Sequence, residues 1–507
     1  MKRKLLKAIL IILSGAVLTL AFAPFRIDIL AIVGLCIFFY LLSNTTSLKQ
    51  AFCRSLLFGI GFFGTSISWV YVSIHLFTES IAAGTAAAVA LVILLSFLHI
   101  VPFAICSYLL TKNSRNYIKL IVYPALWTLF EIVKANLLWG GFPWVSIGYS
   151  QTESPLIWFA NIGGVYLVSY VVAFISCLIV FYMLPIIQDK KLKKPLIAII
   201  IIGLLYLSGA IISIIQPDYH TSKEQKVTLV QGDFGQGFKW ERDNFIKMKA
   251  YYKKIAEQHQ NSLIILSENA VTSFRQYQVP YFNELTDINI ENNNAMLVGS
   301  LNLQKVSDNT SHIYNSSIIV GNGHGVYNKH HLVPFGEYFP IKFFGYVDSA
   351  GLSNFNQGRY IQPLMDAFGT PLANFMCYET AYPEQIRDQL QGAGYISIIS
   401  DDSWFGDSIA RYQQLQISEV RAIENSKFVL STTSNGITAI IAPDGTITKQ
   451  IPKDIRANLE GNIYINHFKS IWGSLGMSII YILILFSIFL TIVLKISTET
   501  KKYITLN

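Results

Sequence analysis

Charged residues are scarce in this sequence of 507 residues. Asp, Glu, Lys and Arg together make up 14% of the chain, whereas apolar residues make up 52%. Soluble domains contain about 25% charged residues, so the composition excludes an ordinary soluble protein. Because a helix needs about 20 residues to cross the hydrocarbon core, the apolar runs predict about eight membrane spans, of which the second is short. The runs lie near 5–23, 27–43, 55–78, 84–111, 119–138, 161–185, 195–215 and 471–496.

Cysteine is also rare, with five residues in the chain. Four of them lie within or beside apolar runs, where cysteine usually packs as a small hydrophobe. Cys377 alone lies in the polar part of the chain, with no Cys or His at metal-binding spacing. The adjacent His330 and His331 would point to opposite faces of a strand, which argues against joint ligation. The sequence therefore predicts no metal site, and Cys377 is either a packing residue or a nucleophile.

Positive charge is nearly absent from every second short loop. The first apolar run follows a basic stretch, as in a signal peptide, but a second run follows at once and favours a retained span. Lys and Arg prefer the cytoplasmic side, so both termini are predicted there and the polar segment 217–469 outside. The net charge of +8 thus reflects topology and does not indicate nucleic-acid binding. The loops poor in cations contain only Arg26 and Lys134. The cation-rich loops and the two termini contain Lys2, Arg3, Lys4, Lys7, Lys49, Arg54, Lys112, Arg115, Lys119, Lys190, Lys191, Lys193, Lys194, Lys495, Lys501 and Lys502.

Three parts follow from this pattern: a membrane domain at 1–216, a polar domain at 217–469, and an eighth span with a cytoplasmic tail at 470–507. In the polar domain, β-branched runs such as "SLIILSE" and "TAIIAPDG" are bounded by Gly, Asn or Asp and predict strands. Apolar residues recur every three or four positions in 244–260 and 411–426, which predicts helices. The mixture indicates an α/β domain whose sheets are covered by helices.

Three polar residues lie at or near the ends of predicted strands. Glu268 closes "SLIILSE", Lys329 follows the hairpin signal "VGNGHGVYNK", and Cys377 closes "PLANFMC". A carboxylate can take the proton of a thiol that attacks a carbonyl, and an ammonium can stabilise the oxyanion that forms. The trio would thus make an acyl-transfer site. Alternatively, Cys377 is a packing residue and the two charges are surface groups or a structural pair.

Three segments resemble a known signature. "LSENA" around Glu268, "YNKHHLVPFGEYFP" around Lys329 and "FMCYE" around Cys377 resemble the Glu–Lys–Cys motifs of the nitrilase (carbon–nitrogen hydrolase) superfamily. With the multi-span half, and with "GGFPWVSIGYSQ", "SDDSWFGDS" and "TSNGITAIIAPDG", the chain is similar to a family of membrane-bound lipoprotein acyltransferases in that superfamily. One departure is Ser267, where many members have proline before the glutamate. The resemblance implies a nitrilase-like αββα sandwich on a helical membrane bundle.

The resemblance also implies a reaction and a place. Such enzymes lie in the bacterial inner membrane, with the catalytic domain in the periplasm. They move a fatty acyl chain from a phospholipid, commonly phosphatidylethanolamine, to the α-amino group of the S-diacylglyceryl cysteine of an apolipoprotein. The expected route is ping-pong through a thioester on Cys377, without a cofactor. By motif position, Glu337 supports the catalytic Glu268, Lys329 and Cys377, and the substrate-binding residues are Trp240, Asn315, Tyr378 and Glu379.

An aromatic segment at 136–159 includes Trp144 and Trp158 and is expected to face the same side as the polar domain. It is either part of a lipid entrance or a plain interfacial belt. Glu131 and Lys134 lie near the end of the fifth predicted span, and we expect them to anchor that helix at the interface.

Two other functions remain open from the residues. A membrane-tethered amidase or nitrilase-like hydrolase would use the same trio with water as the acceptor. A transporter with an outer solute-binding domain is disfavoured, because the spans lack paired buried charges and no corresponding broken helices stand out.

Overall fold

The structure is a computed structural model that describes residues 2–184, 193–235, 239, 241–307, 310–338 and 354–504. The chain forms two compact units. One contains Met1–Gln216, Asp407–Gln416 and Ser470–Asn507, and the other contains Pro217–Gly406 and Ile417–Lys469. The boundaries near residues 216 and 470 lie where the hydropathy changes, but the inclusion of 407–416 in the first unit has no counterpart in the hydropathy pattern.

The first unit is helical. Among its described residues, four helical segments are long and apolar enough to cross a membrane: Ile81–Thr111, Pro155–Met183, Lys193–Thr221 and Ser478–Ile496. A fifth arises if Leu48–Ser66 and Trp69–Thr78, which are bent by 59°, count as one broken span. The other predicted spans correspond to helices that are shorter or carry more charge, so the count of eight stays a prediction. The helices are α1 (Lys2–Ala16), α2 (Ile29–Ser43), α3 (Leu48–Ser66), α4 (Trp69–Thr78), α5 (Ile81–Leu95), α6 (Val101–Thr111), α7 (Asn116–Asn136), α8 (Ala160–Leu178), α10 (Lys193–Ile214), α15 (Ile471–Leu475) and α16 (Ser478–Ile504).

Close backbone contact joins α1 to α3. A side chain at Gly61 would place its Cβ 2.0 Å from the carbonyl oxygen of Ile12, so only glycine permits this approach. Small residues serve helix packing in this way where both helices are apolar.

Glu131 and Lys134 are not interfacial anchors, contrary to the expectation from the sequence. Both are fully buried inside the helical unit. A Glu131 carboxylate oxygen accepts hydrogen bonds from Trp127 Nε1 at 3.1 Å and from the backbone N–H of Ile147 at 2.7 Å. Lys134 Nζ donates to the carbonyl oxygen of Trp144. The side chains of Glu131 and Lys134 therefore hold the segment after α7 in place through hydrogen bonds to its backbone.

Two of the aromatic residues in that segment are buried as well. Trp144 and Tyr149 are almost inaccessible, whereas Trp139 is exposed. Trp144 Nε1 donates to Gln413 Oε1 at 2.7 Å, and Gln413 Nε2 donates to the carbonyl oxygen of Ser66 at 3.0 Å. Trp144 is thus a buried bridge in the helical unit, and neither the lipid-entrance nor the interfacial-belt interpretation fits it in this structure.

The second unit is built around two sheets, each with seven strands among the described residues. The first has the order β14-β1-β2-β4-β5-β7, with β3 beside β4, and the second has the order β13-β12-β11-β10-β9-β8-β6. The central strands β1, β2 and β4 of one sheet and β9, β10 and β11 of the other run parallel. The strands are β1 (Lys223–Gln231), β2 (Leu263–Leu266), β3 (Val271–Phe274), β4 (Ala295–Ser307), β5 (Thr310–Gly321), β6 (Gly323–His324), β7 (Val326–Asn328), β8 (Met365–Ala367), β9 (Thr370–Met376), β10 (Tyr395–Ser400), β11 (Val429–Thr433), β12 (Thr438–Ile441), β13 (Ile447–Ile451) and β14 (Ala457–Ile465).

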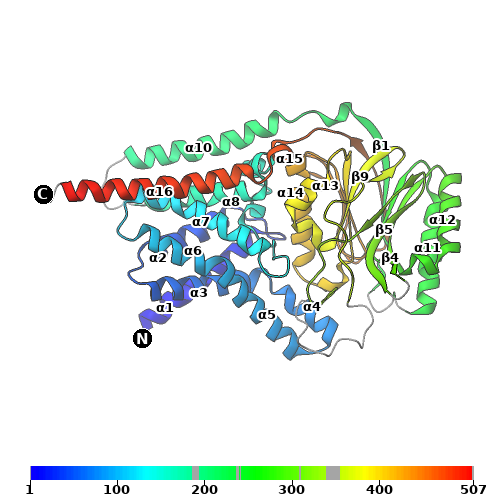
Figure 1. The fold of residues 1–507 in the computed structure, drawn as a ribbon, viewed down its shortest axis with the longest axis horizontal. Helices are drawn as coiled ribbons and strands as arrows, with labels where there is room; N and C mark the ends of the chain where they lie inside the picture. The colour runs from blue at the N-terminus through cyan, green and yellow to red at the C-terminus, as the bar shows by residue number, and fades with distance from the viewer. Residues whose placement is uncertain are drawn as a thin grey trace. The chain divides into compact units, whose positions relative to one another are not determined.

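Helices cover both outer faces of this pair of sheets (Figure 1). Helices α11 (Arg242–Gln258) and α12 (Val279–Glu291) bury Met248, Ile255 and Leu285 against the first sheet. The two sheets pack face to face, with β1 of the first sheet in contact with β11 of the second. The outer face of the second sheet is covered by α13 (Pro383–Gln389) and the 417–425 part of α14 (Ala410–Asn425). The α/β prediction is confirmed as an αββα sandwich.

The predicted hairpin after β5 joins the two sheets. Strand β5 pairs with β7 in an antiparallel manner, but the intervening β6 pairs with β8 of the second sheet. Gly321 and Gly325, at φ +83° and +124°, allow the sharp turns on either side of β6. Lys329, directly after β7, is therefore held by a segment that belongs to both sheets.

Candidate active site

Polar residues follow the ends of four strands in the second unit. Glu268 lies just after β2, Lys329 directly after β7, and Cys377 directly after β9. Asp401 directly follows β10, which runs parallel to β9 with Ile399 opposite Met376. The strand-end positions predicted for the first three residues are confirmed, and the strands come from both sheets.

A buried hydrogen-bonded cluster joins Lys329 to two carboxylates. Lys329 Nζ lies 3.1 Å from Glu268 Oε1 and 2.9 Å from Glu337 Oε1. Asn315 Nδ2 donates to the same two oxygens at 2.7 and 2.9 Å. The second oxygen of Glu337 accepts the backbone N–H of Val333 at 2.8 Å. Four predicted site residues therefore meet in one network that fixes the ammonium and both carboxylates.

The two oxygens of Glu268 have different surroundings. Oε1 accepts from both Lys329 and Asn315, whereas Oε2 accepts from the backbone N–H of Asp401 at 3.0 Å. A carboxylate oxygen has two acceptor positions. Among the described contacts, Oε2 is thus the oxygen that retains capacity to take a proton.

Cys377 begins a tight turn, Cys377–Ala381, and has a φ of +49°. A non-glycine residue in this left-handed region costs about 1–3 kcal/mol, and such strain is often found at functional sites. The turn begins where β9 ends, and the nearby Ser400 side chain lowers the pKa of the thiol. Cys377 is partly exposed as a whole residue, although its thiol group is surrounded by protein.

The charges of the cluster act on the thiol. Burial raises the pKa of Cys377 well above its ordinary value, and the Glu268 carboxylate adds to this, although the Lys329 ammonium opposes it. Burial also raises the pKa of Glu268, against the influence of Lys329. Burial alone would lower the pKa of Lys329, but the two carboxylates hold it well above its ordinary range. The site therefore combines a thiol of lowered acidity, a carboxyl group of raised basicity and an amino group that the two carboxylates hold in its charged form.

Glu379 has an architectural position, in place of the substrate contact predicted for it. Its side chain is fully buried. One oxygen accepts the backbone N–H groups of His330 at 2.7 Å and His331 at 3.1 Å, and the other accepts that of Met376 at 2.8 Å. Tyr327 also donates to it at 2.9 Å. Glu379 thus ties the segment after Lys329 to the turn that carries Cys377.

Tyr378 is partly exposed beside Cys377, and its ring packs edge-on against Tyr382 with centroids 5.3 Å apart. Trp240 lies outside the described residues. His330 and His331 follow β7 in a loop, so the opposite-face argument for a strand does not apply to them. The His331 ring stacks on Tyr382 at 3.6 Å, and His330 Nδ1 is bonded to the carbonyl oxygen of Gly358 at 2.7 Å.

Two buried residues were missed in the sequence. Asp401 contributes its backbone N–H to Glu268, and its carboxylate forms an ion pair with Lys239 at 2.7 Å. Asp401 lies in the quoted segment "SDDSWFGDS", but a backbone donor leaves no residue-type signal. The pairing of two loops 162 residues apart also leaves none.

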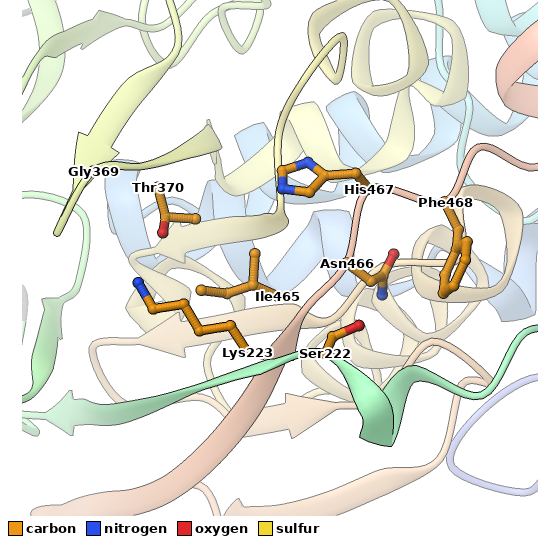
Figure 2. Close-up of a pocket in the computed structure, with 8 residues that line it drawn as sticks. All are labelled: Ser222, Lys223, Gly369, Thr370, Ile465, Asn466, His467 and Phe468. Atoms are coloured by element: carbon orange, nitrogen blue, oxygen red, sulfur yellow. The ribbon is translucent and has the colours of Figure 1, made fainter.

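A separate pocket of about 660 Å³ lies at the opposite strand ends (Figure 2). Lys223 begins β1 and Thr370 begins β9, whereas Cys377 follows the end of β9. Asn466, His467 and Phe468, just after β14, complete its wall. The pocket is therefore distinct from the Cys377 cluster.

Comparison with known proteins follows the division into two units. Residues 226–463 match the model of the carbon–nitrogen hydrolase family, and residues 14–178 match that of the apolipoprotein N-acyltransferase N-terminal domain. The second unit is accordingly a carbon–nitrogen hydrolase domain, of the class that the αββα sandwich and the sequence motifs indicated. A carbon–nitrogen hydrolase from Helicobacter pylori G27 is similar at 17% identity, with 48% of this chain and 89% of that chain covered and a TM-score of 0.37.

Curated relatives cover nearly the whole chain. The apolipoprotein N-acyltransferase of Coxiella burnetii is 35% identical over 475 residues, which are 90% of this chain and 94% of that protein. The one from Azotobacter vinelandii is 31% identical over 466 residues, 90% of this chain and 89% of that protein. This chain belongs to the apolipoprotein N-acyltransferase family. The predicted family and the predicted enzyme class, an acyltransferase, are confirmed.

Proposed function

We propose that this enzyme acylates the α-amino group of the S-diacylglyceryl cysteine of bacterial apolipoproteins, with a phospholipid as donor and a thioester on Cys377 as intermediate. The observation that carries the proposal is the buried Glu268–Lys329–Glu337 cluster, whose charges act on a cysteine of strained backbone conformation. Family membership supports the lipoprotein as acceptor.

In the first half-reaction, Cys377 Sγ attacks the ester carbonyl of the phospholipid. Because the pKa of the thiol is raised, the proton must leave during attack, and Glu268 Oε2 accepts it. The Lys329 ammonium stabilises the oxyanion of the tetrahedral intermediate. The carbon–oxygen ester bond then breaks, the leaving alkoxide takes the proton from Glu268, and a lysophospholipid departs.

In the second half-reaction, the amine of the lipoprotein cysteine attacks the thioester carbonyl. Glu268 takes a proton from the attacking nitrogen while Lys329 again faces the oxyanion. The carbon–sulfur bond breaks, and the thiolate of Cys377 recovers the proton from Glu268. An amide is formed and the free enzyme is regenerated, without a cofactor.

The membrane-spanning helices support a lipid donor. An enzyme tethered by helices on both sides of its catalytic domain remains at the bilayer surface, where phospholipid esters are concentrated. The cationic loops support cytoplasmic termini, an inner-membrane location and a periplasmic catalytic domain at about 217–469. Phosphatidylethanolamine is proposed as the donor, and Trp240 and Tyr378 as substrate contacts.

The decisive experiment is intact mass spectrometry of the purified enzyme after incubation with phosphatidylethanolamine alone, with Cys377→Ala beside it. We expect a fatty-acyl adduct on the wild type that is absent from the variant. A diacylglyceryl-cysteine peptide should then remove the adduct and become N-acylated.

The same experiment tests the competing hydrolase. An adduct that water removes and the peptide ignores would identify hydrolysis in place of transfer. No adduct with phosphatidylethanolamine, phosphatidylglycerol or cardiolipin would contradict the thioester route. Comparison of the three donors also measures the preference for the head group.

A further inference from the structure

Lys239 and Asp401 form a buried ion pair that the mechanism has not used. Lys239 Nζ lies 2.7 Å from Asp401 Oδ2, and the two side chains are only 2% and 1% exposed. The other oxygen of Asp401 accepts the hydroxyls of Ser403 and Ser434 at 2.6 Å each. Buried ion pairs add little net stability compared with apolar residues of the same size, because the charges lose their hydration. Net stability therefore does not account for the presence of this pair.

The pair is connected directly to the proposed base. The backbone N–H of Asp401 donates to Glu268 Oε2 at 3.0 Å, and Oε2 is the oxygen that retains capacity for a proton. The hydrogen bonds to the Asp401 side chain hold this peptide group in place. Lys239 is held in turn, because its carbonyl oxygen accepts the hydroxyl of Thr272 at 2.8 Å.

The pair also balances charge beside Glu268. The carboxylates of Glu337 and Asp401 both disfavour a negative charge on Glu268. Among the described ion pairs, Lys239 is the cation that neutralises Asp401. Burial alone would raise the pKa of Asp401, but Lys239 and the two serine hydroxyls lower it below its ordinary value. Removal of one member would leave a net charge a short distance from the base.

We propose that Lys239 and Asp401 are positioning residues, which turn Glu268 Oε2 toward the thiol of Cys377 and set the pH range in which Glu268 is ionised. The inference rests on the proposed function in one respect, the assignment of Glu268 as the base. Among the described contacts, neither side chain touches the reacting atoms; only the backbone N–H of Asp401 reaches Glu268 Oε2.

The proposal predicts shifts of opposite sign from two substitutions. Lys239→Met leaves an uncompensated carboxylate near Glu268, so Glu268 ionises at higher pH. Asp401→Asn keeps the backbone N–H but leaves an uncompensated ammonium, so Glu268 ionises at lower pH. We expect displacements of about one pH unit each, since a charge within a few ångströms shifts a pKa by about 1–3 units. Lys239→Met with Asp401→Asn should return close to the wild type, and Lys239→Arg should behave as the wild type.

The readout is the pH dependence of alkylation of Cys377 by iodoacetamide, measured on the full-length protein by mass spectrometry of the peptide that contains Cys377. Glu268→Gln is the control, which should abolish the acid limb of this profile. The acyl-adduct assay is run on the same variants. Thermal unfolding is recorded to separate loss of structure from altered ionisation.

Opposite displacements and recovery in the double variant would establish the positioning pair. Displacements of the same sign in the two single variants, profiles that do not move, or a double variant displaced further than either single one would overturn it. Alkylation needs no acyl donor, so its outcome does not depend on the transferase reaction. If the alkylation profiles move as predicted but no acyl adduct forms with any phospholipid, the positioning role stands and the proposed function fails.

Discussion

Glu379 shows how one buried residue can position two proposed catalytic groups through their backbone neighbours. Its carboxylate accepts backbone N–H groups on both sides: that of Met376 before the proposed nucleophile, and those of His330 and His331 after the proposed oxyanion lysine. A carboxylate accepts at both ends, whereas an amide presents a donor at one end.

Glu379→Gln should therefore place an N–H group against a backbone donor. We expect the rate of acyl-adduct formation to fall about 100-fold, because a displacement of about 1 Å has that effect. The free energy of unfolding should fall by about 1–3 kcal/mol. Single-turnover acylation and thermal unfolding measure the two effects. Tyr360→Phe is a matched control, since it removes one exposed hydrogen bond to Asp388 in the same unit; equal losses in both variants would contradict the assignment.

His331 gives the protein a pH dependence whose sign is fixed by its surroundings. Burial, with His330 nearby, lowers the pKa of His331 to about 3, below the ordinary value of 6.5. The unfolded chain then binds a proton that the folded chain does not, so this contribution to stability is present above pH 6.5 and is lost as the pH falls toward 3. The loss is at most about 1.4 kcal/mol per pH unit.

His331→Phe keeps a ring to stack on Tyr382 but cannot titrate. Between pH 7.5 and pH 5 its unfolding temperature should fall less than that of the wild type. Thermal unfolding in the same detergent at several pH values tests this. Parallel curves for the two proteins would show that His331 does not contribute.

At the scale of elements, the strand ends position the site residues, and a single glycine lets β4 approach the turn after β2. Gly299 in β4 lies beside the turn that carries Glu268. A Cβ at this position would lie 2.4 Å from the carbonyl oxygen of Ser267 and 2.9 Å from the Cα of Glu268. Both contacts are with backbone, which cannot move aside without moving Glu268.

Gly299→Ala should accordingly lower the rate of acyl-adduct formation at least tenfold, with Cys377 itself unchanged. The acid limb of Cys377 alkylation should shift as well, because Glu268 is displaced from the Asp401 N–H. Gly203→Ala in α10, where nothing lies within 4 Å of the new Cβ, is the control and should leave both rates intact. A Gly299→Ala enzyme of normal activity would mean that the turn adapts.

Much of this arrangement could be predicted at the level of elements, and some of it could not. Alternating β-branched runs and turn residues indicated which strands end at Glu268, Lys329 and Cys377. They did not indicate that β6 leaves its hairpin to pair with β8, because long-range pairing of two residues has no local pattern. The role of Asp401 was hidden for a related reason, since its contact with Glu268 uses only its backbone.

At the scale of the whole molecule, hydropathy located the apolar runs but not what packs against them. Glu131 and Lys134 were expected at an interface from their position near a helix end. They are buried, because the segment after α7 folds back and supplies Ile147 N–H and the Trp144 carbonyl as partners.

Gln413 is a buried bridge between distant parts of the helical unit. It accepts from Trp144 Nε1, 269 residues away, and donates to the carbonyl oxygen of Ser66. Gln413→Leu removes both hydrogen bonds, and we expect a loss of about 2–4 kcal/mol in stability, at about 1–2 kcal/mol for each bond. Trp144→Phe removes one donor, and the double variant should cost less than the sum of the single ones. Additive losses in thermal or denaturant unfolding would show that the bond is not formed.

The inclusion of residues 407–416 in the helical unit has a practical consequence for recombinant work. A gene trimmed to codons 217–469 would encode the predicted polar domain and residues 407–416, without the rest of the helical unit. In its product, Gln413 would lack its hydrogen-bonding partners Trp144 and Ser66. Gln416 would likewise lack Ala23 and Thr152. Such a truncated protein should aggregate, or regain solubility only when the helices are co-expressed as a separate polypeptide.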